Sequence, residues 1–320
     1  MEGKTRDENT HGTVLTFVIV HWNTEPELKE CIEAILSAGM ENTEVVVVDN
    51  ASDGIETLPW NSYPEWVRLV RNNHNSGYAA ASNQGIRAAR GENILLLNPD
   101  VRVNREGLRE MTARLDSPEA SAVTARLDRP DGTFQRYYMR FPTLPALLAR
   151  YTLLEPLFRN TAPVRRYLET DMEPDAPQAV EQAPGACLMM KKSFLEEIGL
   201  MDERFPLFFN DVDLCRRIAL RKGRILYTPG ARFVHLAQAS VRKMDTHLRN
   251  AEFRVAMIRY MRKYHGACRA LILKGILTAD LCARLAVNLA RFSLGRRTRD
   301  EIKTARKGLR LVLANRSIFE

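Results

Sequence analysis

Four consecutive aliphatic residues, 94–97, are followed directly by Asn98-Pro99-Asp100, and at this junction the chain could bind a ligand. The aliphatic run is typical of a short strand buried on both faces of a sheet, and Pro99 ends it because proline has no N–H for the ladder. In open α/β sheets, ligands bind outside the carboxyl ends of the strands. Asp100 is therefore a candidate for a metal or diphosphate site. The alternative is a simple turn that caps a helix beginning near Glu106.

Two further polar stretches could bind a nucleotide. Asp49 follows the apolar run 44–48, and its carboxylate could accept a hydrogen bond from the ring N–H of a pyrimidine base. Asn75 and Gly77 could bring an amide side chain and backbone amides close to ribose or phosphate, because glycine lets the chain approach closely. A helix cap at Asp49 and an ordinary loop-to-helix turn at Asn75 and Gly77 are the alternatives.

An α/β sheet is needed to position these residues. The expected strands are 14–20, 44–48, 67–70 and 93–97, and the expected helices are 26–38 and 75–90. Strands that alternate with helices and end in polar residues indicate a doubly wound parallel sheet, with a nucleotide at its carboxyl edge. The chain has no Gly-x-x-x-x-Gly-Lys-Ser/Thr loop and no Gly-x-Gly-x-x-Gly after the first strand, which argues against an ATPase or a nicotinamide dinucleotide fold.

The composition is that of a globular protein with an anionic partner. Among 320 residues, 47 Lys and Arg outnumber 39 Asp and Glu, which gives a formal net charge of +8. Residues 1–12 lack the apolar core of a signal peptide and are expected to be disordered. The cysteines form no Cys-x-x-Cys pair, so a reducing cytoplasm is the expected compartment; they are Cys31, Cys187, Cys215, Cys268 and Cys282.

Four motifs in order carry a resemblance to a known family. They are His21-Trp22-Asn23, Asp49-Asn50-Ala51-Ser52-Asp53, the stretch 75–86, and Leu97-Asn98-Pro99-Asp100. Their order and spacing resemble the inverting GT-A glycosyltransferases of family two, in particular the rhamnosyltransferase-like branch, over about residues 14–264. The resemblance implies a Rossmann-like, mostly parallel sheet. It also implies a donor site that includes His21, Asn23, Asp49, Asn75, Gly77, Asn83 and Asn98.

The resemblance also assigns roles in the second half of the chain. Asp211 aligns with the carboxylate that removes the proton from the acceptor hydroxyl, and Asn210 stands where many relatives have glutamate. An amide cannot accept that proton, which leaves Asp211 as the base candidate. Asp213 needs no role beyond the first turn of a helix. Gly185 and Ala186 are expected to face the donor sugar and the acceptor.

The resemblance implies a metal site as well. His235 lies where a histidine near the metal and diphosphate is expected, and with Asp100 it would hold Mg²⁺ or Mn²⁺. A lone histidine is more often a surface or hydrogen-bonded core residue. The glycines usual after it are replaced here by Ala237-Gln238-Ala239, which argues against phosphate contact by that backbone.

The expected organisation is a GT-A domain at 13–265 and a basic amphipathic helical tail at 266–320. The domain divides into a nucleotide-binding half (13–110), a variable insertion with a helix near 146–157 (111–181), and an acceptor and catalytic half (182–265). Wound as a helix, the tail gathers Arg269, Asp280, Arg284 and Arg291 on one arc and has too many charges to span a bilayer. It suits the surface of an anionic membrane. A helical hairpin packed on the domain, or on a second subunit of a homo-oligomer, is the alternative.

The predicted activity is inverting transfer of a hexose from a nucleotide-diphosphate sugar, with dTDP-rhamnose favoured. The acceptor would be a glycan or polyprenyl-linked glycan in cell-surface polysaccharide synthesis, at the inner face of the cell membrane. A nucleotidyltransferase would require a glycine-rich basic loop at 21–25, which is absent. A non-catalytic transferase-like module draws support from Asn98 and Asn210, each of which replaces a common acid. A nucleic-acid-binding protein is disfavoured because the basic tail lacks interleaved aromatics for base stacking.

Overall fold

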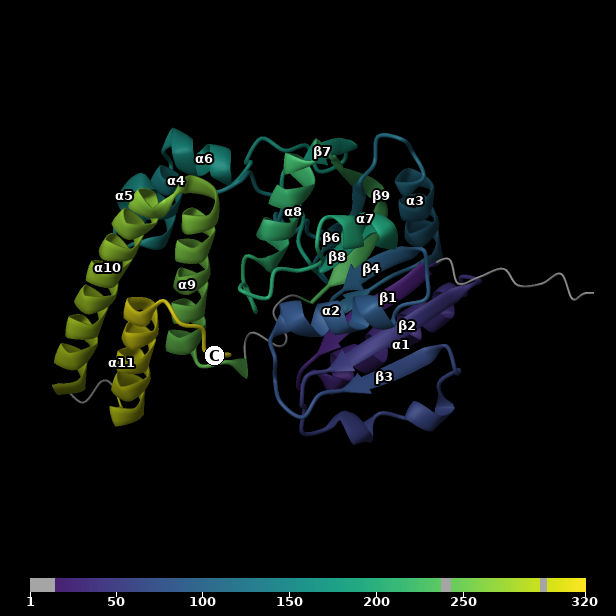
Figure 1. Cartoon of the computed structure of the whole chain (residues 1–320), viewed down its shortest axis with the longest axis horizontal. Helices are drawn as coiled ribbons and strands as arrows, with labels where there is room; N and C mark the ends of the chain where they lie inside the picture. The colour runs from purple at the N-terminus through teal and green to yellow at the C-terminus, as the bar shows by residue number, and fades with distance from the viewer. Residues whose placement is uncertain (1–14, 237–242, 294–297) are drawn as a thin grey trace, which may run out of the picture.

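The computed structural model describes residues 15–236, 243–293 and 298–320. The expected disorder of residues 1–12 and the substituted glycines at 237–239 therefore lie outside the described residues. Figure 1 shows a sheet domain with helices on both of its faces, and a separate group of long helices beside it.

The first half of the chain forms the predicted parallel sheet. Four strands lie in the order β3-β2-β1-β4, and all three neighbouring pairs are parallel. They are β1 (Leu15–His21), β2 (Thr43–Asp49), β3 (Val67–Arg71) and β4 (Asn93–Leu97). The expected strands thus form within one or two residues of their predicted ends.

Helices cover both faces of this sheet, as the doubly wound prediction requires. Successive residues of a strand point to opposite faces, so Phe17 and Ile19 pack with Ile32 of α1 (Glu25–Ala38). Val18 instead packs with Ile86 of α2 (Tyr78–Ala88). Two short 3₁₀ turns, Ile55–Thr57 and Trp60–Ser62, join β2 to β3.

The second half extends the sheet with a change of direction. β8 (Cys187–Lys191) lies antiparallel to β4 and to β6 (Ala122–Asp128), and β6 lies parallel to β9 (Ile225–His235). Two short strands, β5 (Val101–Arg102) and β7 (Gln178–Val180), pair antiparallel with β9. The helices of this half are α3 (Arg105–Leu115), α7 (Lys192–Glu197) and α8 (Asn210–Leu220). The sheet is therefore mixed: all its pairs in the predicted nucleotide-binding half that join β1 to β4 are parallel, and the second half combines antiparallel pairs with the parallel pair β6 and β9.

The predicted insertion contains three short helices. They are α4 (Leu144–Tyr151), α5 (Glu155–Phe158) and α6 (Ala162–Tyr167). The helical insertion predicted near 146–157 is formed by α4 and α5, and one continuous helix is prevented because Pro156 has no N–H to donate to the Thr152 carbonyl, with which its ring would also clash. The chain instead breaks at Thr152, and the N–H of Leu153 donates to Asp280 at 2.6 Å.

Three long helices pack together and form what we call the helical arm. They are α9 (Thr246–His265), α10 (Ala267–Ser293) and α11 (Arg299–Ala314), and they share one apolar cluster with Phe205 and Phe209. The predicted boundary at 265/266 falls between α9 and α10. No helix among the described residues is long and apolar enough to span a bilayer.

The middle of the polar arc predicted for α10 does not lie on its solvent side, although Arg269 and Arg291 at its ends are exposed. Asp280, in the middle of that arc, is buried, and its carboxylate accepts hydrogen bonds from Arg254 of α9 at 3.1 Å and from Arg284 at 2.8 Å. Burying a carboxylate is tolerated when such cationic partners compensate it. The alternative of a packed helical hairpin therefore describes how α10 meets the rest of the chain.

Candidate functional site

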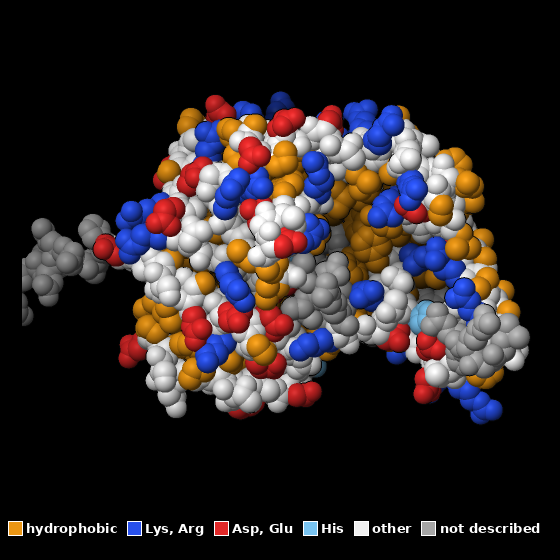
Figure 2. Space-filling view, turned by 180° about the vertical axis from the view of Figure 1, so that it is seen from behind, with side chains coloured by type: hydrophobic (Ala, Val, Ile, Leu, Met, Phe, Trp, Pro, Cys, Tyr) orange, Lys and Arg blue, Asp and Glu red, His pale blue; other side chains and the backbone are white. Residues whose placement is uncertain are grey.

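A cavity of about 480 Å³ opens at the carboxyl edge of the parallel strands. Val20, Asn50 and Asn98 reach it from β1, β2 and β4, and Ala186 reaches it from the start of the antiparallel β8. Figure 2 shows the molecule hollowed between the sheet domain and the helical arm, with apolar side chains inside the hollow. Eight of the predicted site residues line the cavity: Asn75, Gly77, Asn98, Asp100, Gly185, Ala186, Asp211 and His235.

Asp100 and His235 meet in this cavity although 135 positions separate them in sequence. They belong to or adjoin the antiparallel pair β5 and β9, in which Val101 lies opposite His235. His235 Nε2 lies 3.3 Å from Asp100 Oδ1. Gln135 fixes the imidazole ring from behind, since its side chain lies 2.8 Å from Nδ1 and donates to the His235 carbonyl at 2.6 Å.

These two residues fit a divalent cation. His235 Nε2 is buried and has no hydrogen-bond partner among the residues that the structure describes, and a carboxylate oxygen and an imidazole nitrogen are both ordinary metal ligands. No group of three His, Cys, Asp or Glu side chains gathers as a metal site among the residues that the structure describes. Asp100 and His235 would supply an oxygen and a nitrogen ligand to a cation here, and a bound diphosphate and water could supply others. Mn²⁺ fits better than Mg²⁺, which prefers oxygen ligands.

Asp211 lines the same cavity from the first turn of α8. Phe209, two residues before Asp211, has a left-handed backbone with φ of 63°, which bulky residues rarely adopt. Its ring is buried against Phe253 and Tyr260 of α9, with centroids 5.4 and 5.5 Å away, and this packing holds the turn. The helical arm thus fixes the position from which Asp211 enters the cavity.

The environment of Asp211 suits a proton acceptor. The N–H of Gly185 donates to Oδ2 at 3.2 Å, and the N–H of Val212 donates to Oδ1 at 2.8 Å. Burial raises the pKa of Asp211 above its ordinary value, and these hydrogen bonds offset only part of that effect. A raised pKa makes a carboxylate a stronger base while it stays ionised near neutral pH.

The two halves of the domain are joined across the cavity by Tyr78, Gly77 and Gly185. Tyr78, the first residue of α2, donates from its hydroxyl to the Gly185 carbonyl at 3.0 Å. Gly77 has φ of 84°, and a Cβ there would lie 2.7 Å from Pro206. Glycine is required at this position for both backbone and steric reasons. The turn is closed by Asn75, whose side chain accepts from the Gly77 N–H at 3.0 Å.

Four predicted donor-binding residues do not line the cavity. His21 is buried, with Nδ1 3.0 Å from the Thr24 hydroxyl, and burial lowers the pKa of its imidazole. Asp49 is buried at the end of β2, accepts from the Ser52 N–H at 3.2 Å and lies 4.0 Å from His21 Nε2.

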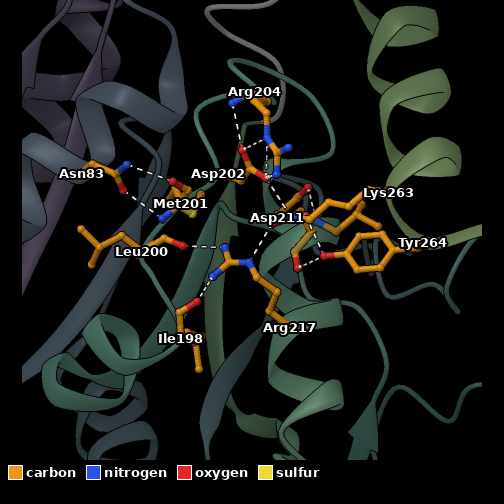
Figure 3. Close-up of polar contacts among 12 residues, drawn as sticks. Asn83, Ile198, Leu200, Met201, Asp202, Arg204, Asp211, Arg217, Lys263 and Tyr264 are labelled. Atoms are coloured by element: carbon orange, nitrogen blue, oxygen red, sulfur yellow. Dashed lines mark hydrogen bonds and ion pairs between the residues drawn. The ribbon is translucent and has the colours of Figure 1, made fainter.

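Asn23 and Asn83 have polar partners within the protein. The side chain of Asn23 accepts from the Asp53 N–H at 3.0 Å. Asn83 exchanges hydrogen bonds of 3.0 and 2.9 Å with the backbone of Met201, and it donates to Glu203 at 2.8 Å. Figure 3 shows this amide pairing with Met201. Asn83 therefore holds the 201–203 segment against α2.

Asp213 has a structural role beside Asp211. It is buried, pairs with Arg217 at 2.8 Å, and accepts hydrogen bonds from Lys263 and from the Tyr264 hydroxyl. These partners join α8 to α9, as Figure 3 shows around Lys263, Tyr264 and Arg217. The two carboxylates of this helix turn therefore have different roles: Asp211 lines the cavity, and Asp213 holds α8 against α9.

Several cavity residues had no role in the sequence predictions. They are chiefly apolar or aromatic, namely Tyr78, Tyr137, Leu207, Phe208, Ile318 and Phe319. Tyr78 lies inside one of the recognised motifs, but Ile318 and Phe319 lie in the tail, where no motif marks them. They return to the cavity because Glu252 of α9 anchors their segment, accepting from the Ser317 hydroxyl at 2.9 Å and from the Ile318 N–H at 3.0 Å.

Comparison with known proteins gives the same fold. This chain superposes with a TM-score of 0.54, at 19% identity, on the structure of the mannosyltransferase PcManGT from Pyrobaculum calidifontis in complex with GDP-Man and Mn2+. The match covers 96% of this chain and 86% of that chain. The doubly wound sheet and the cavity at its strand ends define a GT-A fold.

Sequence relatives give the family. Residues 16–199 match the family described as Glycosyl transferase family 2, and the chain belongs to it. A hexosyltransferase of low-salt glycan biosynthesis, Agl10 of Haloferax volcanii, is 28% identical over 63% of this chain. An N-acetylglucosaminyl-diphospho-decaprenol L-rhamnosyltransferase of Mycobacterium tuberculosis is 28% identical over 73% of this chain. The matches cover 61% of the Haloferax protein and 80% of the mycobacterial one.

Proposed function

We propose that this protein transfers a hexose from a nucleotide-diphosphate sugar to a hydroxyl of a glycan or lipid-linked glycan, with inversion at the anomeric carbon. The observation that carries the proposal is a single cavity that contains both a base candidate, Asp211, and a metal-ligand pair, Asp100 and His235. Rhamnose is the favoured sugar and dTDP-rhamnose the favoured donor. The mycobacterial relative, whose name specifies a rhamnosyl transfer to a diphospho-decaprenol acceptor, supports this choice.

The reaction follows from the chemistry of these side chains. Asp211 accepts the proton of the acceptor hydroxyl, and the oxygen forms a bond to the anomeric carbon as the bond from that carbon to the diphosphate breaks. The nucleoside diphosphate leaves with the electron pair, and one displacement inverts the centre. Asp100 and His235 would hold a divalent cation whose charge offsets that of the leaving diphosphate. The turn at Asn75 and Gly77 would lie against the nucleotide.

Calorimetric binding of dTDP, UDP and GDP, with and without Mg²⁺ or Mn²⁺, tests this proposal first. We expect selective binding of one diphosphate that Mn²⁺ strengthens more than Mg²⁺ does. Transfer from the matching sugar nucleotide to an N-acetylglucosaminyl-diphospho-alkyl acceptor is then measured. Failure of all three diphosphates to bind would support the non-catalytic and nucleic-acid-binding alternatives instead.

Ile318 and Phe319 would form the acceptor side of the site. They line the cavity together with Leu207, Phe208 and Asp211, and the 2.9 Å bond from Ser317 to the buried Glu252 holds them there. Arg259 adds a second anchor, donating to the Asn315 carbonyl at 3.0 Å. An apolar wall beside the base suits the ring face of a sugar or the start of a lipid.

Substitution of Phe319 by alanine is therefore expected to raise the KM for the acceptor about tenfold, from the loss of one buried aromatic contact. Nucleotide binding and the KM for the donor are expected to stay unchanged. Leu313→Ala is the matched control, because Leu313 is exposed on α11 and does not line the cavity. An unchanged acceptor KM in Phe319→Ala would place the acceptor elsewhere.

A further inference from the structure

The face of α10 that is exposed to solvent is apolar, as buried surfaces usually are. Among the described residues, ten of the twelve large apolar side chains that are exposed lie on α10 or in the segment 153–158. Those on α10 are Leu271, Ile272, Ile276, Val287, Leu289 and Phe292. A helix that packs only on its own domain normally presents polar residues to solvent. Exposed apolar patches of this kind mark sites of interaction.

The small residues of α10 complete this face. Between Ala270 and Arg291, the other exposed positions are glycine, alanine or cysteine, so no exposed residue in this stretch carries a charge or a strong hydrogen-bonding group; they are Gly275, Ala279, Cys282, Ala283, Ala286 and Ala290. The charged side chains of the same stretch lie elsewhere. Asp280 is buried against α9, while Lys274 and Arg284 are half-buried. Between Ala270 and Arg291 the helix therefore has an apolar outward face, while exposed charges lie at its two ends, on Arg269 and Arg291.

Segment 153–158 adds to the same surface. The hydrogen bond from the Leu153 N–H to Asp280 places this segment directly against the middle of α10, and Figure 1 shows α5 beside that helix. Leu153, Leu154, Leu157 and Phe158 are 42–76% exposed. We call these four residues and the exposed apolar face of α10 the apolar ridge.

A basic groove adjoins the apolar ridge. Leu289, Phe292 and Ile302 form its apolar part, and its volume is about 740 Å³. Five basic side chains and one acidic side chain line the rest, namely Arg299, Lys303, Arg306, Lys307, Arg310 and Asp300. Figure 2 shows Lys and Arg side chains beside apolar ones on the helical arm. Apolar surface next to clustered cations matches the acyl chains and phosphates of an anionic bilayer.

We propose that the apolar ridge lies in the interface of an anionic phospholipid bilayer, with the basic groove around lipid phosphates. A second copy of the chain suits this surface less well. In a two-fold contact the basic groove of one copy would meet another part of the same patch on its partner. The apolar ridge has no acidic side chain that could pair with those basic residues. The contact requires both the tail and an internal segment more than 100 residues earlier. This proposal does not depend on the sugar that the protein transfers.

Co-sedimentation of the full chain with vesicles tests the proposal. We expect binding to vesicles of phosphatidylcholine and phosphatidylglycerol, and weak binding to phosphatidylcholine alone. Ile272→Glu and Leu157→Glu should each lower vesicle affinity at least about tenfold, because each removes the insertion of one large apolar side chain. Lys303→Gln should lower it about fivefold and only for the anionic vesicles.

Leu220→Glu is the matched control, because Leu220 is 61% exposed on α8, away from the helical arm. Its vesicle binding should equal that of the unchanged chain. Circular dichroism and nucleotide binding confirm that each variant is folded. The proposal is overturned if the unchanged chain stays in the supernatant with anionic vesicles. It is also overturned if Ile272→Glu and Leu157→Glu bind these vesicles with the affinity of the unchanged chain. A dimer that Ile272→Glu dissociates, without vesicle binding, would identify a second copy as the occupant.

Discussion

Asp211→Asn is expected to lower kcat for sugar transfer by about 10²- to 10⁴-fold, the usual contribution of a general base. An amide cannot accept the proton of the acceptor hydroxyl. The substitution keeps the size of the side chain, but Gly185 and Val212 donate to separate oxygens of Asp211, so the single amide oxygen can keep only one of these two hydrogen bonds. Because the side chain keeps its size, nucleotide binding should be unchanged, and the loss should fall on kcat.

The pH dependence gives an independent measurement of the same group. Because burial raises the pKa of Asp211, the profile of kcat/KM should fall as the pH decreases through a value above that of an ordinary aspartate. Ionisation of Asp211 has opposite effects on activity and on stability: the ionised form is the active one, but it is the less favourable one for the folded state. A raised folded pKa means that the ionised form destabilises the fold, and removing that charge in Asp211→Asn opposes the loss of one hydrogen bond, so the melting temperature at neutral pH should stay within a few degrees of that of the unchanged chain.

Asp116→Asn is the control, since Asp116 is exposed at the end of α3, away from the cavity. It should retain the kcat of the unchanged chain. If Asp211→Asn turned over at the unchanged rate, Asp211 would not be the base. A lowered kcat accompanied by loss of nucleotide binding and of the cooperative melting transition would instead indicate that the variant is damaged in its fold.

The sheet was predictable because its signal is local. The aliphatic residues 94–97 and the run 44–48 are long enough to be strands and end abruptly in polar residues, and both form as β4 and β2. The direction of each strand within the sheet was harder to predict. That β8 runs antiparallel to β4 depends on how the chain returns from the insertion, which no local periodicity records.

Sequence motifs indicated many of the residues that line the cavity, but a place at a strand end did not decide which side chains reach it, since His21 and Asp49 end β1 and β2 and bond to protein groups instead. Asp100 follows its strand directly, whereas Ile318 and Phe319 reach the cavity only because Glu252, 65 residues before Ser317, bonds that residue. Asp280 shows the same limit in the helical arm. Helical periodicity places it with other charges, but its burial follows from its bond to Arg254 of another helix.

Asp100→Ala is expected to abolish the strengthening of nucleotide diphosphate binding by Mn²⁺ and to lower kcat by about 100-fold or more. The physical reason is that a divalent cation stabilises the charge on the leaving diphosphate by several kcal/mol, and about 1.4 kcal/mol corresponds to tenfold in rate. Binding of the nucleotide in the absence of metal should change little. Calorimetry with and without Mn²⁺ separates the two effects without any need for turnover.

His235→Asn distinguishes a metal ligand from a partner of Asp100. If Nε2 coordinates the cation, the variant should lose more affinity with Mn²⁺ than with Mg²⁺, because Mg²⁺ depends less on a nitrogen ligand. If His235 only supports the Asp100 carboxylate, to which it lies 3.3 Å away, both metals should lose affinity equally. His74→Asn, at an exposed position, is the matched control. Equal losses would leave Asp100 as the ligand and make His235 a positioning residue, held by Gln135 for that purpose.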